Sequence, residues 1–277
     1  MSKLTLMYIT NSAHEAARVI QAGVDRIFVD LEKIGKEERQ RGLDTVISGH
    51  TVADVATIRT ALPKAEILVR LNPIGPYSRD EVNEVIQAGA NLVMLPMFTT
   101  KEEVETLVNL VAGRVRISLL LETQQALVRL PEYLQLSEYI DEIHIGLNDL
   151  HLAMRLDFMF EIVASGLLDS VAERIKEKGI RFGFGGIARV GQGDIPAEEV
   201  LIEHVRLGSE IVILSRRFRE NLPNDQGVLA AEIAKLREWE EKWRQLPHEE
   251  LIAHSTALRQ RIFEVARSRR QARAHSV

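Results

Sequence analysis

The segments IQAGVDRIFVDL (20–31) and IQAGANLVMLP (86–96) repeat one pattern: the end of a helix, a glycine, a short turn and an apolar run. A glycine at a helix end adopts the left-handed backbone conformation at little cost. The apolar run is rich in Val, Ile, Leu and Phe and lacks strict polar alternation, which is typical of a strand buried on both faces of a parallel sheet. Each segment therefore predicts a helix that leads into a buried parallel strand.

Comparable apolar runs occur eight times along the chain, with amphipathic helical stretches between them. The runs lie at 4–10, 25–31, 66–72, 91–97, 116–122, 142–147, 181–186 and 210–215. Eight buried strands that alternate with helices are typical of an α/β protein with a (β/α)8 or TIM barrel. The alternative is an open, doubly wound sheet, but its glycine-rich turn is missing after the first run, in ITNSAHE (9–15). We therefore predict a closed barrel.

We expect two regions, a barrel core over 1–224 and C-terminal helices over 225–277. The first of these helices would serve as the eighth helix of the barrel. The second carries an apolar stripe that would pack on a partner subunit in a homo-oligomer, formed by Leu251, Ile252, Leu258, Ile262 and Val265. The basic end of this tail could indicate nucleic acid binding, but we expect a frayed, solvated terminus. Its arginines are Arg267, Arg269, Arg270 and Arg273.

Composition excludes several classes of function. The chain has 277 residues, with 35 Lys and Arg against 40 Asp and Glu, so its net charge of −5 gives no electrostatic reason to bind nucleic acid. It has no cysteine, which excludes disulfides, thiolate metal sites and cysteine nucleophiles. No apolar run approaches the roughly 20 residues of a membrane span, and the N-terminal stretch lacks a signal-peptide pattern. We expect a cytoplasmic protein that acts on a small molecule and does not bind membranes.

Polar residues follow the predicted strands, where functional groups of a parallel barrel project. Those at or just after the ends of the second, third, fifth and sixth runs are Asp30, Glu32, Arg70, Glu122, Asn148 and Asp149. Pro96 and Met97 end the fourth run, and Gly186 ends the seventh. We expect all of these residues at one face of the barrel.

Glu122 and Asp149 would lie on adjacent strand ends, where two carboxylates could share Mg²⁺ or Mn²⁺. The alternative is structural: Glu122 would pair with Arg70, and Asp149 would cap a helix that begins at Leu150. Arg70, with its fixed planar donors, suits an oxyanion or a 2-oxo-acid carbonyl. The alternative is that Arg70 pairs with a core carboxylate, and the residues alone leave it open.

His50 is the best placed of the eight histidines to act as a general base, since it ends the long polar connection 32–50. That connection could form a lid over the active-site face. A plain position between loop and helix is an equal alternative for His50. The glycine-rich segment GFGGIARVGQGDIP (183–196), with Arg189, could bind a phosphate or a second carboxylate, or it could be a rim loop.

Several of these motifs occur together in one known family. FVDLE (28–32), VRLNP (69–73), GANLVMLPMF (89–98), LLLET (119–123) and IDEIHIGLNDLHLAM (140–154) resemble the class II, metal-dependent pyruvate aldolase and citrate lyase β-subunit family. The resemblance extends from about residue 4 to 218. It implies a TIM barrel, an oligomer, and cleavage or formation of a carbon–carbon bond to a pyruvate-like 2-oxo acid with Mg²⁺, Mn²⁺ or Co²⁺.

The resemblance also implies roles for individual residues. Glu122 and Asp149 would be metal ligands, and Arg70 would stabilise the enolate oxygen. Backbone amides around Asn148 and Asp149, together with Pro96, Met97 and Gly186, would contact the substrate. Asp30 and Glu32 would line the site and either hydrogen-bond to metal-bound water or orient Arg70.

The chain departs from the family pattern near its second strand. Lys33 follows Glu32 where the aldolase branch has a histidine, so His50 would be that base on a longer loop. The lyase branch has DLED where this chain has DLEK. One alternative is therefore an enzyme that acts on an acyl-coenzyme A thioester, with Arg189, Arg216 and Arg217 on the coenzyme phosphates. Another is a barrel without turnover that serves as a binding subunit.

Overall fold

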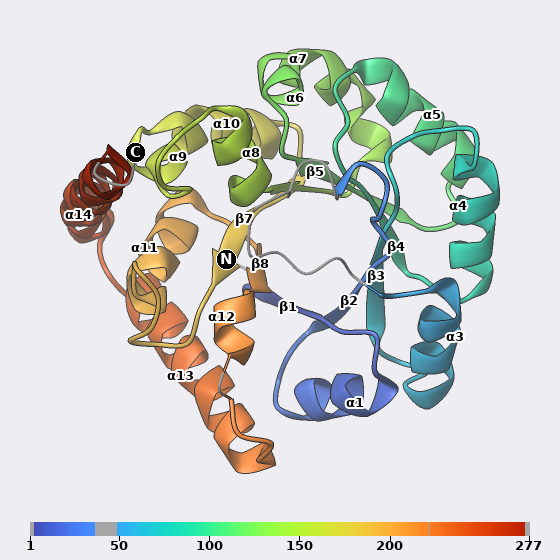
Figure 1. The fold of residues 1–277 in the computed structure, drawn as a ribbon, viewed down its shortest axis with the longest axis horizontal. Helices are drawn as coiled ribbons and strands as arrows, with labels where there is room; N and C mark the ends of the chain where they lie inside the picture. The colour runs from blue at the N-terminus through green and yellow to red at the C-terminus, as the bar shows by residue number, and fades with distance from the viewer. Residues whose placement is uncertain (1–2, 37–48, 221, 275–277) are drawn as a thin grey trace.

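A computed structural model describes residues 3–36, 49–220 and 222–274. Its eight strands all pair in parallel with their neighbours, and β8 pairs with β1 to close the barrel (Figure 1). The strands are β1 (Thr5–Ile9), β2 (Arg26–Asp30), β3 (Glu66–Arg70), β4 (Leu92–Leu95), β5 (Arg116–Leu121), β6 (Glu142–Ile145), β7 (Arg181–Ile187) and β8 (Ile211–Leu214). The predicted TIM barrel is confirmed.

Helices surround the barrel as an outer ring (Figure 1). Those that follow the first four strands are α1 (Ala13–Gln21), α3 (Val52–Ala61), α4 (Ser78–Gln87) and α5 (Lys101–Val111). Those after β5 and β6 are α6 (Gln124–Val128), α7 (Leu130–Tyr133), η1 (Leu134–Tyr139), α8 (Leu147–Ala153), α9 (Glu161–Ala164) and α10 (Leu167–Glu177). The remaining helices are α11 (Ala197–Leu207), α12 (Arg216–Arg219), α13 (Gln226–Arg244) and α14 (His248–Ala274). The lid expected over 32–50 falls largely outside the described residues.

Side chains inside the barrel form layers, because alternate residues of each strand point inward. The apolar layer contains Met7, Phe28, Leu68, Met94 and Leu120. Below it, at the amino ends of the strands, lies a group that we call the lower charged layer: Arg26, Glu66, Arg116, Glu142 and Arg181.

The lower charged layer is a continuous chain of ion pairs. Two guanidinium nitrogens of Arg26 donate to the two carboxylate oxygens of Glu142 at 2.6 and 2.8 Å, and its Nε donates to Glu66 at 2.6 Å. Arg181 also donates to Glu142, at 2.6 Å, and Arg116 pairs with Glu66. The side chains of Arg26 and Glu142 are 0% and 1% exposed. This layer closes the bottom of the barrel.

The C-terminal helices pack on the barrel of their own chain. α13 contacts α11 and α1, and α14 contacts α9 and α11. Leu251, Leu258 and Ile262, predicted to pack on a partner subunit, are instead buried within their own chain, whereas Ile252 and Phe263 are exposed. No helix in the described part of the chain combines the length and apolarity needed to cross a lipid bilayer.

The expectation of a frayed C-terminus is wrong through Ala274, because α14 is helical to that residue. Ion pairs hold its end: Arg269 donates to Asp194 at 2.7 Å, and Arg270 and Arg273 donate to Asp157 at 2.5 Å each. These acidic residues lie in the loops after β6 and β7. Sequence reasoning missed the pairs because partners so distant along the chain leave no local pattern.

Candidate functional site

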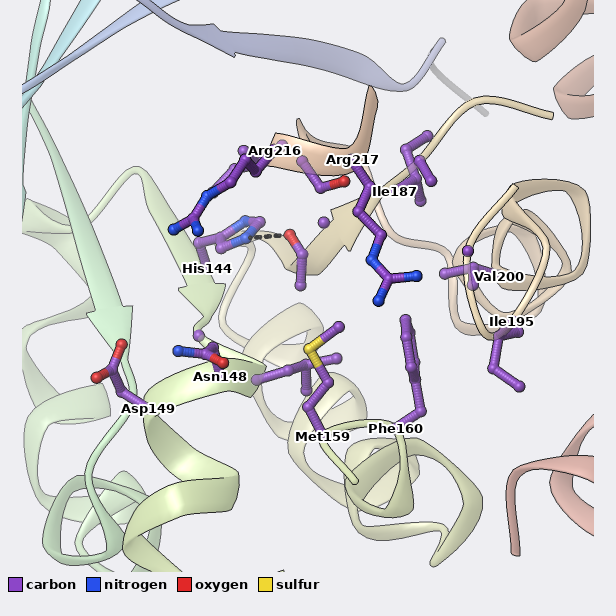
Figure 2. Close-up of a pocket in the computed structure, with 18 of the residues that line it drawn as sticks. His144, Asn148, Asp149, Met159, Phe160, Ile187, Ile195, Val200, Arg216 and Arg217 are labelled. Atoms are coloured by element: carbon purple, nitrogen blue, oxygen red, sulfur yellow. Dashed lines mark hydrogen bonds between the residues drawn. The ribbon is translucent and has the colours of Figure 1, made fainter. Parts of the chain in front are cut away.

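A cavity of about 620 Å³ opens at the carboxyl ends of the strands (Figure 2). Five residues that the sequence indicated line it: Arg70, Glu122, Asn148, Asp149 and Gly186. The other predicted site residues, Asp30, Glu32, His50, Pro96 and Met97, do not belong to its wall. The structure therefore divides the predicted set into a group that faces the cavity and a group around it.

Arg70 is fixed in the cavity wall by Asp30. Its Nε and Nη2 donate to the two oxygens of Asp30 at 2.8 and 2.7 Å, and Nη2 lies 3.4 Å from Glu32. Although burial would raise the pKa of Asp30, the positive charges of Arg70 and Lys36 hold that pKa well below its ordinary value. The same carboxylates raise the pKa of Arg70 despite its burial. Arg70 therefore presents a permanent charge in a fixed orientation.

Lys36 is a second buried cation at this face, and sequence reasoning missed it. Its Nζ lies 2.8 Å from Asp30 and 3.8 Å from Glu32. Residues 32–35 do not form a helix, so the spacing of Lys36 from Glu32 gave no local signal of this pairing. Lys36 and Arg70 together compensate the two acids that follow β2.

Glu122 is positioned by backbone rather than by a cation. Its Oε1 accepts a hydrogen bond from the Met97 N–H at 3.1 Å, and Met97 has a φ of 54°, unusual for a residue with a side chain. A Cβ added at Gly146 would lie 2.8 Å from Glu122 Oε2, so only glycine leaves room for this carboxylate. Met97, predicted to contact substrate, thus orients Glu122 through its main chain.

The electrostatic environment of Glu122 opposes its ionisation. The side chain is 2% exposed, and burial, followed by the nearby charge of Asp149, raises the pKa of Glu122 well above its ordinary value. Arg70 acts in the opposite direction but does not compensate. A cation between Glu122 and Asp149 would relieve this repulsion.

The donor set fits a hard divalent cation. Among the described residues there is no cluster of three or more His, Cys, Asp or Glu side chains with metal-ligand geometry, but Glu122 and Asp149 both line the polar side of the cavity. Mg²⁺ is commonly held by one or two carboxylates, with water and substrate oxygens completing its shell. The buried position of Glu122 beside Asp149 and its raised pKa fit such an ion.

His50 lies just before α3, whose N-cap is Thr51. Its Nδ1 accepts a hydrogen bond from the Asp30 N–H at 3.0 Å, so the neutral ring carries its proton on Nε2. Burial lowers the pKa of His50, and Asp30 and Asp54 only partly offset that effect. In this orientation Nε2 carries the proton and can only donate a hydrogen bond. To act as a general base through Nε2, the ring would have to rotate away from the Asp30 N–H and carry its proton on Nδ1.

Asn148 and Asp149 lie in the first turn of α8, which begins at Leu147. The alternative in which Asp149 caps a helix starting at Leu150 is therefore wrong. The helix starts earlier because Gly146 ends the β6 segment and is itself the N-cap residue. Both side chains face the cavity (Figure 2).

The glycine-rich segment 183–196 forms the end of β7 and the start of the following loop. Gly185, Gly186 and Asp194 line the cavity, but Arg189 does not. Arg189 Nη2 instead donates to the Glu220 carbonyl at 2.7 Å. Ser215, Arg216 and Arg217, after β8, complete this side of the wall.

The comparisons with known proteins identify a family for this chain. A family model described as HpcH/HpaI aldolase/citrate lyase matches residues 4–160. The chain belongs to the HpcH/HpaI aldolase/citrate lyase family. The matched range contains Asp30, Arg70, Glu122 and Asp149, whereas β7, β8 and the C-terminal helices lie beyond it.

Two solved structures are similar in fold. An HpcH/HpaI aldolase from Desulfitobacterium hafniense DCB-2 is 14% identical, with a TM-score of 0.60 over 88% of this chain and 94% of that one. An HpcH/HpaI aldolase/citrate lyase family protein from Burkholderia cenocepacia J2315 is 15% identical, with a TM-score of 0.59 over 85% of this chain and 94% of that one. At such identities the likeness shows the barrel fold alone. No curated protein sequence matches the chain.

Proposed function

We propose that this protein is a divalent-metal-dependent carbon–carbon lyase that cleaves or forms the bond to the enolate of a pyruvate-like 2-oxo acid. The observation that carries the proposal is the cavity wall formed by Arg70, Glu122 and Asp149. A fixed guanidinium lies there beside a buried carboxylate whose pKa is raised by burial and by a second acid. Membership of the HpcH/HpaI aldolase/citrate lyase family supports a lyase.

Each group has a distinct task in this proposal. Glu122 and Asp149 would hold Mg²⁺, Mn²⁺ or Co²⁺, which when bound polarises the 2-oxo group of the substrate. Arg70 donates to the oxygen that becomes negative in the enolate, and its pairing with Asp30 keeps it aligned. The first turn of α8, at Asn148, faces the substrate carboxylate.

His50 is the proposed proton acceptor in the ring orientation that leaves Nε2 unprotonated. In that orientation its Nδ1 carries the proton and no longer accepts the Asp30 N–H. In this proposal, proton uptake by His50 requires the loss of its hydrogen bond to the main chain of Asp30, the residue that orients Arg70.

The structure offers less support for the two alternatives. Of the arginines suggested for coenzyme A phosphates, Arg189 bonds to the Glu220 carbonyl and Arg217 pairs with Asp194 at 3.2 Å. A binding subunit without turnover would have no need of the aligned Arg70 and the buried Glu122. Neither alternative is favoured by a specific observation.

Thermal unfolding with Mn²⁺ or Mg²⁺, with and without oxalate as an enolate mimic, tests the proposal. Ligands that bind only the folded state raise its stability by about 2.7 kcal/mol at a hundred times their Kd, which is several degrees in Tm. We expect the Tm to rise with metal and to rise further with oxalate, and we expect both increases to be lost in Glu122→Gln. Glu177→Gln, at an exposed position of α10, is the matched control and keeps both. No response to metal in the wild type would overturn the proposal.

We also propose a homo-oligomer, supported by Ile252 and Phe263, large apolar residues exposed on α14. Light scattering coupled to size-exclusion chromatography tests it. A particle with the 31.2 kDa mass of one chain would contradict it.

A further inference from the structure

The cavity has two chemically different halves. The polar half contains Arg70, Glu122, Asn148 and Asp149. The other, which we call the apolar half, is lined by Met159, Phe160, Ile187, Ile195 and Val200. Figure 2 shows Asn148 and Asp149 on one side of the cavity, and Phe160, Ile195 and Val200 on the other.

The apolar half is built by the ends of several elements rather than by one loop. Ile187 ends β7 and Val200 belongs to α11, while Met159 and Phe160 precede α9. Ile195, Val200 and Ile187 are all at most 4% exposed, so they are held by the surrounding core. Such walls form a pre-shaped compartment, as ligand pockets usually are.

Two charged residues of the cavity wall, Arg217 and Asp194, compensate each other beside the apolar half. Arg217 lies 3.2 Å from Asp194, which also accepts a hydrogen bond from Arg269 of α14 at 2.7 Å. An anionic substituent entering here would have to displace Asp194 from these arginines. This arrangement disfavours a carboxylate or phosphate at the far end of the substrate and favours an uncharged group.

The volume leaves a place for a second reactant. A three-carbon oxo acid held at Arg70 and Glu122 fills only a small part of a cavity of about 620 Å³, and the remaining space is continuous with the apolar half. The acceptor in a condensation must approach the enolate carbon from this space.

Building on the proposed function, we propose that the apolar half binds the uncharged aliphatic or aromatic tail of an aldehyde acceptor. In condensation, the enolate carbon attacks the aldehyde carbon, and the carbonyl electron pair moves to oxygen, which takes a proton. The product is a 4-hydroxy-2-oxo acid with an apolar substituent at C4. Cleavage is the reverse, and the proton lost from the pyruvate methyl group balances the proton gained by oxygen.

Two substitutions distinguish an effect on ligand binding in the apolar half from an effect on the stability of the protein. Val200→Thr places a hydroxyl in its wall with almost no change of shape. Val104→Thr, on α5, buries the same hydroxyl at a position that does not line the cavity and serves as the matched control. Both variants bury an additional polar group, so their unfolding free energies report the common cost.

The first measurement needs neither metal nor turnover. Binding of 1-butanol, 1-hexanol and 1-octanol, followed by ligand-observed NMR, should tighten roughly fourfold per methylene in the wild type and in Val104→Thr. Hexanol should bind Val200→Thr roughly fivefold more weakly. Binding that is independent of chain length, or equal in the two variants, would overturn the proposal.

The second measurement uses the reaction. Metal-dependent deuterium exchange into the methyl group of pyruvate alone reports the proposed function without an acceptor. With exchange present, kcat/KM should rise from acetaldehyde to butanal to hexanal and be lowest for glyoxylate. Exchange without this rise in kcat/KM would overturn the proposed tail site and leave the lyase proposal intact. Absence of exchange would overturn the lyase proposal, and the alcohol series would then decide whether the apolar half binds an apolar tail.

Discussion

The two ends of the barrel both contain buried charges, but their charges are balanced differently. In the lower charged layer each glutamate lies between two arginines: Glu142 between Arg26 and Arg181, and Glu66 between Arg26 and Arg116. At the upper end, Arg70 and Lys36 pair with Asp30 and Glu32, whereas Glu122 lies near a second acid, Asp149.

The pKa shifts express this difference. In the lower layer the pKa of Glu66 is lowered by Arg26 and Arg116 in spite of burial. In the upper layer burial and Asp149 raise the pKa of Glu122. A carboxylate that is fully compensated serves the fold, whereas one left beside another acid is poised to take a cation.

The largest expected effect is on stability at the lower end. Glu142→Leu would leave Arg26 buried without its bidentate partner, and we expect a loss of about 3–5 kcal/mol in urea unfolding. The double variant Arg26→Met, Glu142→Leu should recover most of this loss. Turnover of the folded fraction should remain, and equal stability of the single variant and wild type would contradict the contrast between the layers.

The next effect is on catalysis at the upper end. Arg70→Lys keeps a positive charge but lacks the planar pair of donors that engages Asp30. We expect kcat to fall by about 10²–10³, the effect of removing one oxyanion donor. Steady-state kinetics with saturating metal provide the measurement. An unchanged kcat would show that charge alone suffices at this position.

A smaller effect concerns His50 and pH. Because burial lowers its pKa, the neutral ring persists below pH 6.5, and kcat/KM should fall only as the pH drops through that lowered value. His50→Asn can still accept the Asp30 N–H but takes no proton, so we expect about 10²-fold slower turnover without this acidic limb. If His50→Asn kept the fall of kcat/KM at acidic pH, that fall would come from the titration of another group.

The smallest effect is a gain of stability. Because the pKa of Glu122 is raised in the folded protein, the metal-free protein loses stability as the pH rises from the ordinary pKa of a glutamate up to that raised value. Glu122→Gln removes this cost, so at pH 8 we expect its metal-free Tm to exceed that of the wild type by a few degrees. At pH 4 the two proteins should unfold at similar temperatures, and a variant less stable at both pH values would contradict the unbalanced upper layer.

The sequence predicted the barrel because buried strands and helices have local periodicity, as in IQAGVDRIFVDL (20–31) and its counterpart at 86–96. It also located Arg70, Glu122 and Asp149, since each follows an apolar run. The position of Glu122, however, depends on the absent side chain of Gly146 and on the main chain of Met97. Such contacts between strands have no signature in either segment, and neither does the ion pair of Lys36 with Asp30.

The arginines of α14 have a consequence for the order in which the protein is made. Arg269 is synthesised 75 residues after Asp194, and Arg273 is synthesised 116 residues after Asp157. A nascent chain that has completed all eight strands therefore contains every group of the polar half before the loops beside the apolar half receive these partners. The ion pairs that α14 makes with the loops beside the apolar half can therefore form only after the rest of the barrel has been synthesised.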